Sequence, residues 1–119
     1  MARNGYDIIS VGGGLGGSAL AIAMAKKGHR VLVLEGEPAF RDRVRGEQVA
    51  AWGVAEAKEL GIFDLLLSAC ANEEPWWDVY LGGIQIQHRN VVETTPQQVP
   101  NLTFFHPAMQ ETLLQEAKS

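Results

Sequence analysis

Five glycines lie close together near the start of the chain, in the run Gly12-Gly13-Gly14-Leu15-Gly16-Gly17. An apolar segment at 6–11 precedes the run, and a segment at 18–27 that is rich in Ala, Leu, Ile and Met follows it. A backbone without Cβ atoms allows a ligand to approach closely, and a helix that begins there offers unpaired N–H groups and the positive end of its dipole. The residue types and their spacing therefore predict a turn that binds phosphate.

The surrounding elements extend this prediction. We expect a strand at 6–11, a helix at 18–27 that Gly28 ends, and a second strand at 30–34 followed by Glu35. A strand, glycine turn, helix, strand and acid in this order are typical of proteins that bind a dinucleotide by its pyrophosphate. The carboxylate of Glu35 would accept hydrogen bonds from a ribose and would repel a 2′-phosphate, which makes NADP a poor candidate. The alternative, a scaffold turn without a ligand, is less favoured because every feature agrees.

Individual glycines have different expected roles. Gly12 would let the chain turn sharply out of the first strand, and Gly14 would bring the backbone close to the pyrophosphate. Gly17 would let the helix pack tightly on the sheet. Leu15 and Gly16 complete the cofactor-binding set within the turn.

Three arginines form a positive run at Arg41, Arg43 and Arg45, in a chain whose formal net charge is −4. A guanidinium group binds phosphate well because its charge is permanent and its donors form a fork. The alternative is a solvated surface run paired with Asp42 and Glu47. A dinucleotide-binding motif in the same chain favours the phosphate role.

Two stretches resemble a known family. Residues 5–35 resemble the opening of FAD-dependent oxidoreductases. The stretch Arg43-Val44-Arg45-Gly46-Glu47, with the helical segment that ends at Leu60-Gly61, resembles the class A flavoprotein monooxygenases, or aromatic hydroxylases, such as para-hydroxybenzoate hydroxylase. The resemblance covers the whole chain but only the N-terminal part of that family. It implies that Arg43 and Arg45 contact FAD, with Arg45 near the pyrophosphate. It also implies that His106 stands where the family has a residue that touches the cofactor, although a capping or strand-end role for His106 is equally open.

The resemblance implies a function as well. The chain would be the FAD-binding segment of an NAD(P)H-dependent monooxygenase that hydroxylates an aromatic or polyketide-like small molecule, with NADH or NADPH as transient reductant. The flavin carries the chemistry in such enzymes, so no catalytic side chain is expected here. Flavin-dependent halogenases and prenyl reductases share these motifs. Further alternatives are a non-catalytic fragment that binds nucleotide weakly or self-associates, and an NAD-binding module, which the arginine run disfavours.

The predicted fold is α/β, a Rossmann-like βαβ FAD-binding domain with a β-hairpin excursion. Residues 1–75 would form the first part of the FAD domain, 76–101 an excursion towards a missing substrate domain, and 102–119 the return to the FAD domain. We expect helices at 47–60, 62–69 and 107–118, a break in the pattern at 72–75, a loop at 90–101 and a strand at 102–105.

The excursion contains Gly82-Gly83 between two alternating runs, which is a hairpin signal. Strict alternation would place Gln85, Gln87 and Arg89 on one face, and Ile84, Ile86 and His88 on the other. We expect the adjacent Trp76 and Trp77 to pack in the core.

Composition excludes several other classes. The chain of 119 residues is 46% hydrophobic and 20% charged, which suits one globular domain. No apolar run approaches the length of a membrane span, no secretory signal opens the chain, and Cys70 is the single cysteine, so we expect a cytoplasmic protein. Low basicity argues against nucleic-acid binding, and His88 has no ligand-type neighbour at metal-binding spacing.

Overall fold

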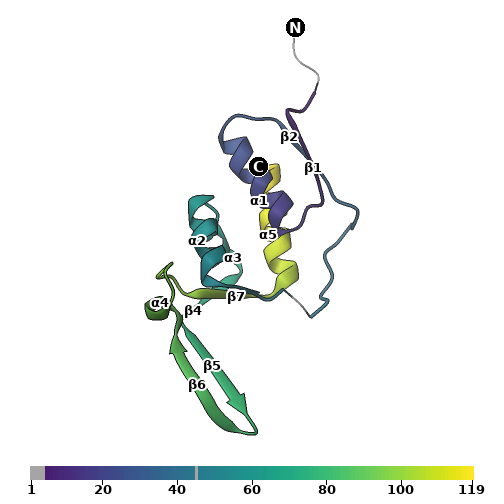
Figure 1. Ribbon diagram of the computed structural model, residues 1–119. Helices are drawn as coiled ribbons and strands as arrows, with labels where there is room; N and C mark the ends of the chain where they lie inside the picture. The colour runs from purple at the N-terminus through teal and green to yellow at the C-terminus, as the bar shows by residue number, and fades with distance from the viewer. Residues whose placement is uncertain (1–4, 45) are drawn as a thin grey trace. The chain divides into compact units, whose positions relative to one another are not determined.

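The computed structural model describes residues 5–44 and 46–119 of the chain (Figure 1). The described residues divide into two compact units. One contains residues of the ranges 1–45 and 106–119, and the other contains residues 46–105. Residues 46–105 thus lie between the two segments of the N-terminal unit, and that unit is discontinuous in sequence.

A parallel strand pair with a helix between its strands forms the first part of the N-terminal unit. The strands β1 (Ile8–Val11) and β2 (Val31–Leu34) pair in parallel, and α1 (Leu15–Lys26) connects them. The predicted βαβ arrangement is therefore confirmed. The helix begins earlier than the expected residue 18, because the glycine turn itself winds into it: the Ser18 N–H donates to the Gly14 carbonyl at 2.9 Å.

A second helix, α5 (His106–Lys118), packs against α1 in this unit (Figure 1). The buried residues of α1 are small or aliphatic, and those of α5 are larger. They are Ser18, Ala19, Ala21 and Ile22 on α1, with Met109 and Leu113 on α5. Small side chains on one helix allow the larger side chains of the other to fill the space between the axes.

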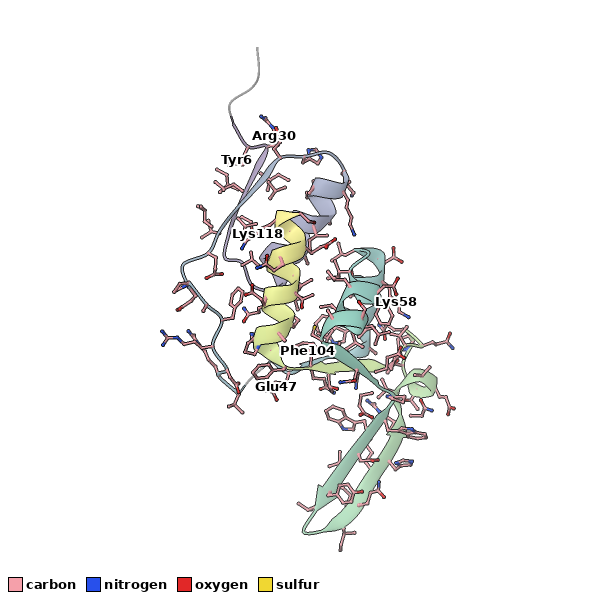
Figure 2. The ribbon with its side chains drawn as sticks, turned by 180° about the vertical axis from the view of Figure 1, so that it is seen from behind. Tyr6, Arg30, Glu47, Lys58, Phe104 and Lys118 are labelled. Atoms are coloured by element: carbon pink, nitrogen blue, oxygen red, sulfur yellow. The ribbon has the colours of Figure 1, made fainter. Side chains whose placement is uncertain are left out.

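An ion pair joins the beginnings of the two strands. Arg30 Nη2 lies 3.1 Å from Asp7 Oδ1, and the Arg30 backbone N–H donates to Asp7 Oδ2 at 2.9 Å. The hydrogen bonds from Arg30 lower the pKa of Asp7 to about 2. The segment that enters β1 is therefore fixed to the segment that enters β2, and Figure 2 labels Tyr6 and Arg30 at this end.

An antiparallel sheet with two helices forms the body of the second unit. The sheet order is β3 (Gln48–Val49), β7 (Asn101–Phe104) and β4 (Ala71–Glu74), and the helices are α2 (Ala51–Glu59) and α3 (Phe63–Ala69). The core of this unit contains Val54, Ala57, Ile62, Leu66, Leu102 and Phe104. Figure 2 labels Glu47 and Phe104, whose backbones are joined by a 3.0 Å hydrogen bond from the Phe104 N–H to the Glu47 carbonyl.

Two expectations for this body are wrong. The expected helix at 47–60 begins as β3, and the expected break at 72–75 overlaps β4. Both segments pair with the distant strand β7, and this tertiary pairing overrides their local preferences.

Asparagine side chains cap two helices of the second unit. The Ala51 N–H, at the start of α2, donates to Oδ1 of the buried Asn101 at 2.9 Å. Asn90 Oδ1 accepts from the first turn of α4 (Val91–Thr94), a short helix inside the expected loop. Asparagine is among the residues that stabilise helix N-termini best, which explains why a helix forms there.

The hairpin consists of β5 (Trp76–Leu81) and β6 (Ile84–Asn90), which confirms the expected turn. Gly82 and Gly83 have φ values of 57° and 81°, the positive values that a tight hairpin turn requires. An irregularity between Val79 and Tyr80 shifts the register. Gln85 Nε2 and His88 Nδ1 therefore both lie within hydrogen-bond distance of Asp78 Oδ1, at 3.0 Å and 2.6 Å, and the expected partition of the two faces is wrong.

The hairpin exposes most of its large apolar side chains. Trp76 is 44% exposed and stacks on the His88 ring with centroids 4.4 Å apart, and Trp77 is 39% exposed. The expectation that the tryptophans pack in the core is therefore wrong. The other exposed apolar residues are Tyr80, Leu81, Ile84 and Ile86.

Within the described part of the chain, none of the helices has both the length and the apolar character needed to cross a membrane.

Candidate cofactor-binding site

Gly12 forms the sharp turn that the sequence predicts. Its φ is 102°, a conformation that side chains rarely adopt, and its N–H donates to the Leu34 carbonyl at 2.7 Å. The turn therefore leaves β1 while it stays hydrogen-bonded to the end of β2.

Gly17 has a stricter steric requirement than packing on the sheet. A Cβ at this position would overlap the Gly12 carbonyl oxygen and lie 3.0 Å from Ser10 Oγ. The buried Ser18 adds a hydrogen bond from its Oγ to the Gly13 carbonyl at 2.8 Å. The first turn of α1 thus packs directly on the glycine turn, and Gly17 is needed where the two meet.

The N-terminus of α1 has the features of an anion site. Gly14 is its N-cap residue, no side chain caps the helix, and its first turn contains no acidic residue. A Cβ on Gly14 would meet only Gln110 Nε2, at 3.7 Å, and a Cβ on Gly16 would meet nothing within 4 Å. Space in front of the helix, combined with its positive dipole end, suits a phosphate group.

Glu35 follows β2 and holds the glycine turn. Its Oε2 accepts the Gly13 N–H at 2.6 Å, and its Oε1 accepts the Glu37 N–H at 2.9 Å. These backbone hydrogen bonds, that of Glu37 first, lower the pKa of Glu35, so the carboxylate is charged at neutral pH. A carboxylate oxygen has more than one acceptor site, so both oxygens retain capacity for ribose hydroxyls.

Sequence reasoning assigned no role to Gly13. A Cβ there would lie 3.1 Å from Glu35 Oε2 and 3.2 Å from Glu35 Cβ. Gly13 therefore permits the close approach of Glu35 to the turn. The signal in the sequence is a glycine at the position between Gly12 and Gly14, which the motif leaves open to any residue.

A pocket of about 150 Å³ lies beside Glu35. It is lined by Glu35, Glu37, Ala39, Phe40, Arg41, Arg43 and Gln110. The structure thus brings Glu35 together with Arg43, while Arg45 lies outside the described residues. His106 is the first residue of α5, whereas the pocket-lining residue of that helix is Gln110, one turn further on. Helical periodicity from His106 could have drawn attention to this position.

Arg43 forms an ion pair inside this loop. Its Nη2 lies 3.4 Å from Glu37 Oε1, and both side chains are about half exposed, at 52% and 47%. Asp42, one of the two acids expected as surface partners, instead accepts the Val44 N–H at 2.8 Å. Because the pair is solvent-accessible, its net stabilisation is small and Arg43 can exchange partners.

The chemistry of these groups fits a dinucleotide. An uncapped helix N-terminus, an ionised carboxylate at the end of the adjacent strand and an arginine occur within one unit of the chain. The described residues contain no group of three or more His, Cys, Asp or Glu side chains arranged to hold a metal ion.

Comparison with known families agrees with this geometry. A family model described as an NAD(P)-binding Rossmann-like domain matches residues 11–65. Squalene monooxygenase of Eremothecium gossypii is 31% identical over 102 residues, which make up 83% of this chain and 20% of the relative. Squalene monooxygenase 1,2 of Brassica napus is 35% identical over 104 residues, with coverages of 87% and 20%.

Solved structures show the same fold. The p-nitrophenol 4-monooxygenase PnpA of Pseudomonas putida superposes with a TM-score of 0.77 at 22% identity, over 93% of this chain and 29% of that one. The protein pqsL of Pseudomonas aeruginosa, described as a probable FAD-dependent monooxygenase, has a TM-score of 0.74 at 19% identity, with coverages of 96% and 30%.

The chain is related to the N-terminal part of FAD-dependent monooxygenases. This relationship confirms the predicted resemblance and the Rossmann-like α/β fold. The chain spans about a fifth of the length of these two curated relatives and under a third of the two solved chains.

Proposed function

We propose that this chain is the FAD-binding segment of an NAD(P)H-dependent monooxygenase. One observation carries the proposal: the ionised carboxylate of Glu35 is hydrogen-bonded to the glycine turn, directly beside the uncapped N-terminus of α1. An anion-binding helix end and a ribose-binding carboxylate at this spacing match the two ends of an adenosine diphosphate group.

Each residue has a defined task in this proposal. Gly14, Leu15 and Gly16 present backbone N–H groups to the pyrophosphate, and Glu35 accepts the ribose hydroxyls. Arg43 and Arg45 supply positive charge to the phosphates. The bound flavin would accept reducing equivalents from NAD(P)H and activate O₂, while the residues of this segment bind and orient the cofactor.

FAD is favoured over NAD as the resident ligand. The arginine-bearing loop adds a second group of phosphate donors beyond the glycine turn, which an NAD-binding module does not need. The relatives reported above are named as monooxygenases, and one solved structure is described as FAD-dependent. These names also favour a monooxygenase over a halogenase or a prenyl reductase.

The relatives support a small-molecule substrate. Their names specify squalene and p-nitrophenol, an apolar and an aromatic compound respectively. We assign residues 76–101 to the excursion towards the substrate domain, because the hairpin carries apolar side chains that its own unit leaves exposed. The sequence contains a single cysteine, Cys70, and therefore forms no internal disulfide, which is consistent with a reducing, cytoplasmic location.

Retention of flavin tests the proposal. The purified chain is incubated with FAD and desalted, its visible spectrum is recorded, and NAD is titrated as a competitor. We expect retained flavin in the unmodified chain and in the control Glu59→Ala, which changes an exposed acid of the second unit, and a clear loss of affinity in Glu35→Ala. Retention of as much flavin by Glu35→Ala as by the unmodified chain would contradict the proposed site. Tighter binding of NAD than of FAD in the competition would contradict it as well.

The exposed hairpin supports a second candidate, a chain that self-associates. Tyr80, Ile84 and Ile86 are each at least 60% exposed, which favours association with another apolar surface. Light scattering over a range of chain concentrations, with and without FAD, separates the two candidates. A concentration-dependent oligomer without bound flavin favours the second.

A further inference from the structure

Glu37 lies at the centre of a short chain of interactions beside the glycine turn. Its backbone N–H donates to Glu35 Oε1 at 2.9 Å, and its own Oε1 lies 3.4 Å from Arg43 Nη2. Glu35 is in turn bonded to the Gly13 N–H. A continuous path therefore connects the turn to the arginine that faces the pocket.

The carboxylate of Glu37 uses the same donor group that a phosphate would use. Arginine binds both kinds of anion through charge-assisted hydrogen bonds, and it cannot satisfy two anions in the same direction. The hydrogen bond from the Glu37 backbone to Glu35 keeps the base of the Glu37 side chain within reach of Arg43. Both side chains line the pocket beside Glu35.

We propose that Glu37 is an internal competitor for Arg43, which occupies the guanidinium until the phosphates of the dinucleotide displace it. Glu37 thus lowers cofactor affinity, because the phosphates must replace it at the Arg43 guanidinium. This inference rests on the proposed function of the site.

The competitor role predicts an unusual sign for a substitution. Glu37→Gln removes the charge that holds Arg43 and keeps the shape of the side chain, so FAD should bind about two- to fivefold more tightly, the scale of an exposed ion pair. In the Arg43→Ala background the same substitution should leave FAD affinity unchanged. A control, Glu116→Gln, changes the net charge equally on the surface of α5 and should have no effect.

Isothermal titration of FAD into the wild type, the two single variants, the double variant and the control gives a double-mutant cycle. Equal tightening in both backgrounds would mean general repulsion between Glu37 and the phosphates, which overturns the inference. Weaker binding by Glu37→Gln would mean that Glu37 pre-orients Arg43 for the ligand, which also overturns it. If the wild type and Glu37→Gln bind FAD with equal affinity, only this inference is overturned. If neither the wild type nor any variant binds FAD, the proposed function is overturned as well.

Discussion

The glycine turn and the β5–β6 hairpin differ in how far contacts within their own units complete them. At the turn, the N–H groups of Gly12 and Gly13 and the hydroxyl of Ser18 all find acceptors within the same unit. The two strands of the hairpin pair along their length apart from one irregularity, but Ile84 and Ile86 are 70% and 60% exposed.

This difference separates a self-contained site from an element that needs another surface. An isolated two-stranded hairpin is only marginally stable in water, so the exposed apolar side chains indicate further packing. The turn holds its conformation through contacts that the unit supplies itself. Substitutions at the turn should therefore have large effects in this chain, and substitutions on the hairpin small ones.

The largest effect is expected at the closest contact of the turn. Gly17→Ala places a Cβ on the Gly12 carbonyl oxygen, so the free energy of unfolding should fall by about 3 kcal/mol and FAD binding should be lost. The neighbouring Gly16→Ala has open space and should change stability by less than about 1 kcal/mol. Urea unfolding of both variants measures the difference, and similar stabilities would show that the steric argument is wrong.

Glu35 provides the next test. Glu35→Gln removes the charge and one of the acceptors that hold the turn, so FAD affinity should fall about tenfold or more, the scale of one hydrogen bond to a charged group. Titration calorimetry measures this loss. Wild-type affinity in this variant would show that Glu35 is not part of the binding site.

The same carboxylate gives the turn a defined pH dependence. The folded pKa of Glu35 is lowered, so its contribution to stability is fully present above the pKa of the unfolded chain and is lost only as pH falls through the lower folded value. Between pH 7 and pH 5 we therefore expect no loss of the Glu35 contribution. Comparing the unfolding of wild type and Glu35→Gln at both pH values tests this, because a difference that grows on acidification to pH 5 would mean a raised folded pKa and would contradict the lowered one.

A smaller effect is expected in the arginine run. Arg45→Ala should weaken FAD binding about fivefold, the net scale of one hydrogen bond, and Arg41→Ala should weaken it less. Equal losses of affinity in the two variants would show that the arginines act only through general electrostatic attraction. Repeating both titrations at high salt separates the two cases, because general attraction is screened more strongly.

The smallest effect on stability is expected on the hairpin. Replacing Ile84 or Ile86 with Thr should change the free energy of unfolding by less than about 0.5 kcal/mol, since both side chains are already exposed. The same substitutions should reduce any concentration-dependent association seen by light scattering. A loss of stability as large as that of Gly17→Ala would mean that the hairpin is not an open surface in this chain.

The sequence predicted those parts of the fold that local signals determine. The βαβ unit follows from apolar runs punctuated by glycine, and the hairpin turn follows from Gly82-Gly83. The strands β3 and β4 were missed because each is defined by pairing with β7, far away in the sequence. The bulge in the hairpin likewise has no local signal, so the faces of β6 were assigned incorrectly.

The candidate site divides in the same way. Gly12, Gly17 and Glu35 stand out because the motif sets their spacing, and the structure places them around one turn. Glu37 lines the pocket only two residues after Glu35, whereas Gln110 joins it through tertiary approach, from a helix that begins more than ninety residues after the turn. No pattern within the first forty-five residues could have indicated it.

The discontinuity of the N-terminal unit constrains the order in which the chain can fold during synthesis. Its helix α1 leaves the ribosome early, but the helix that packs on it, α5, begins only at His106. The intervening residues 46–105 form a unit of their own, in which the N-terminus of α2 is capped only after Asn101 has been synthesised. The second unit can therefore complete its structure first, and α1, which follows the glycine turn, acquires its packing against α5 last.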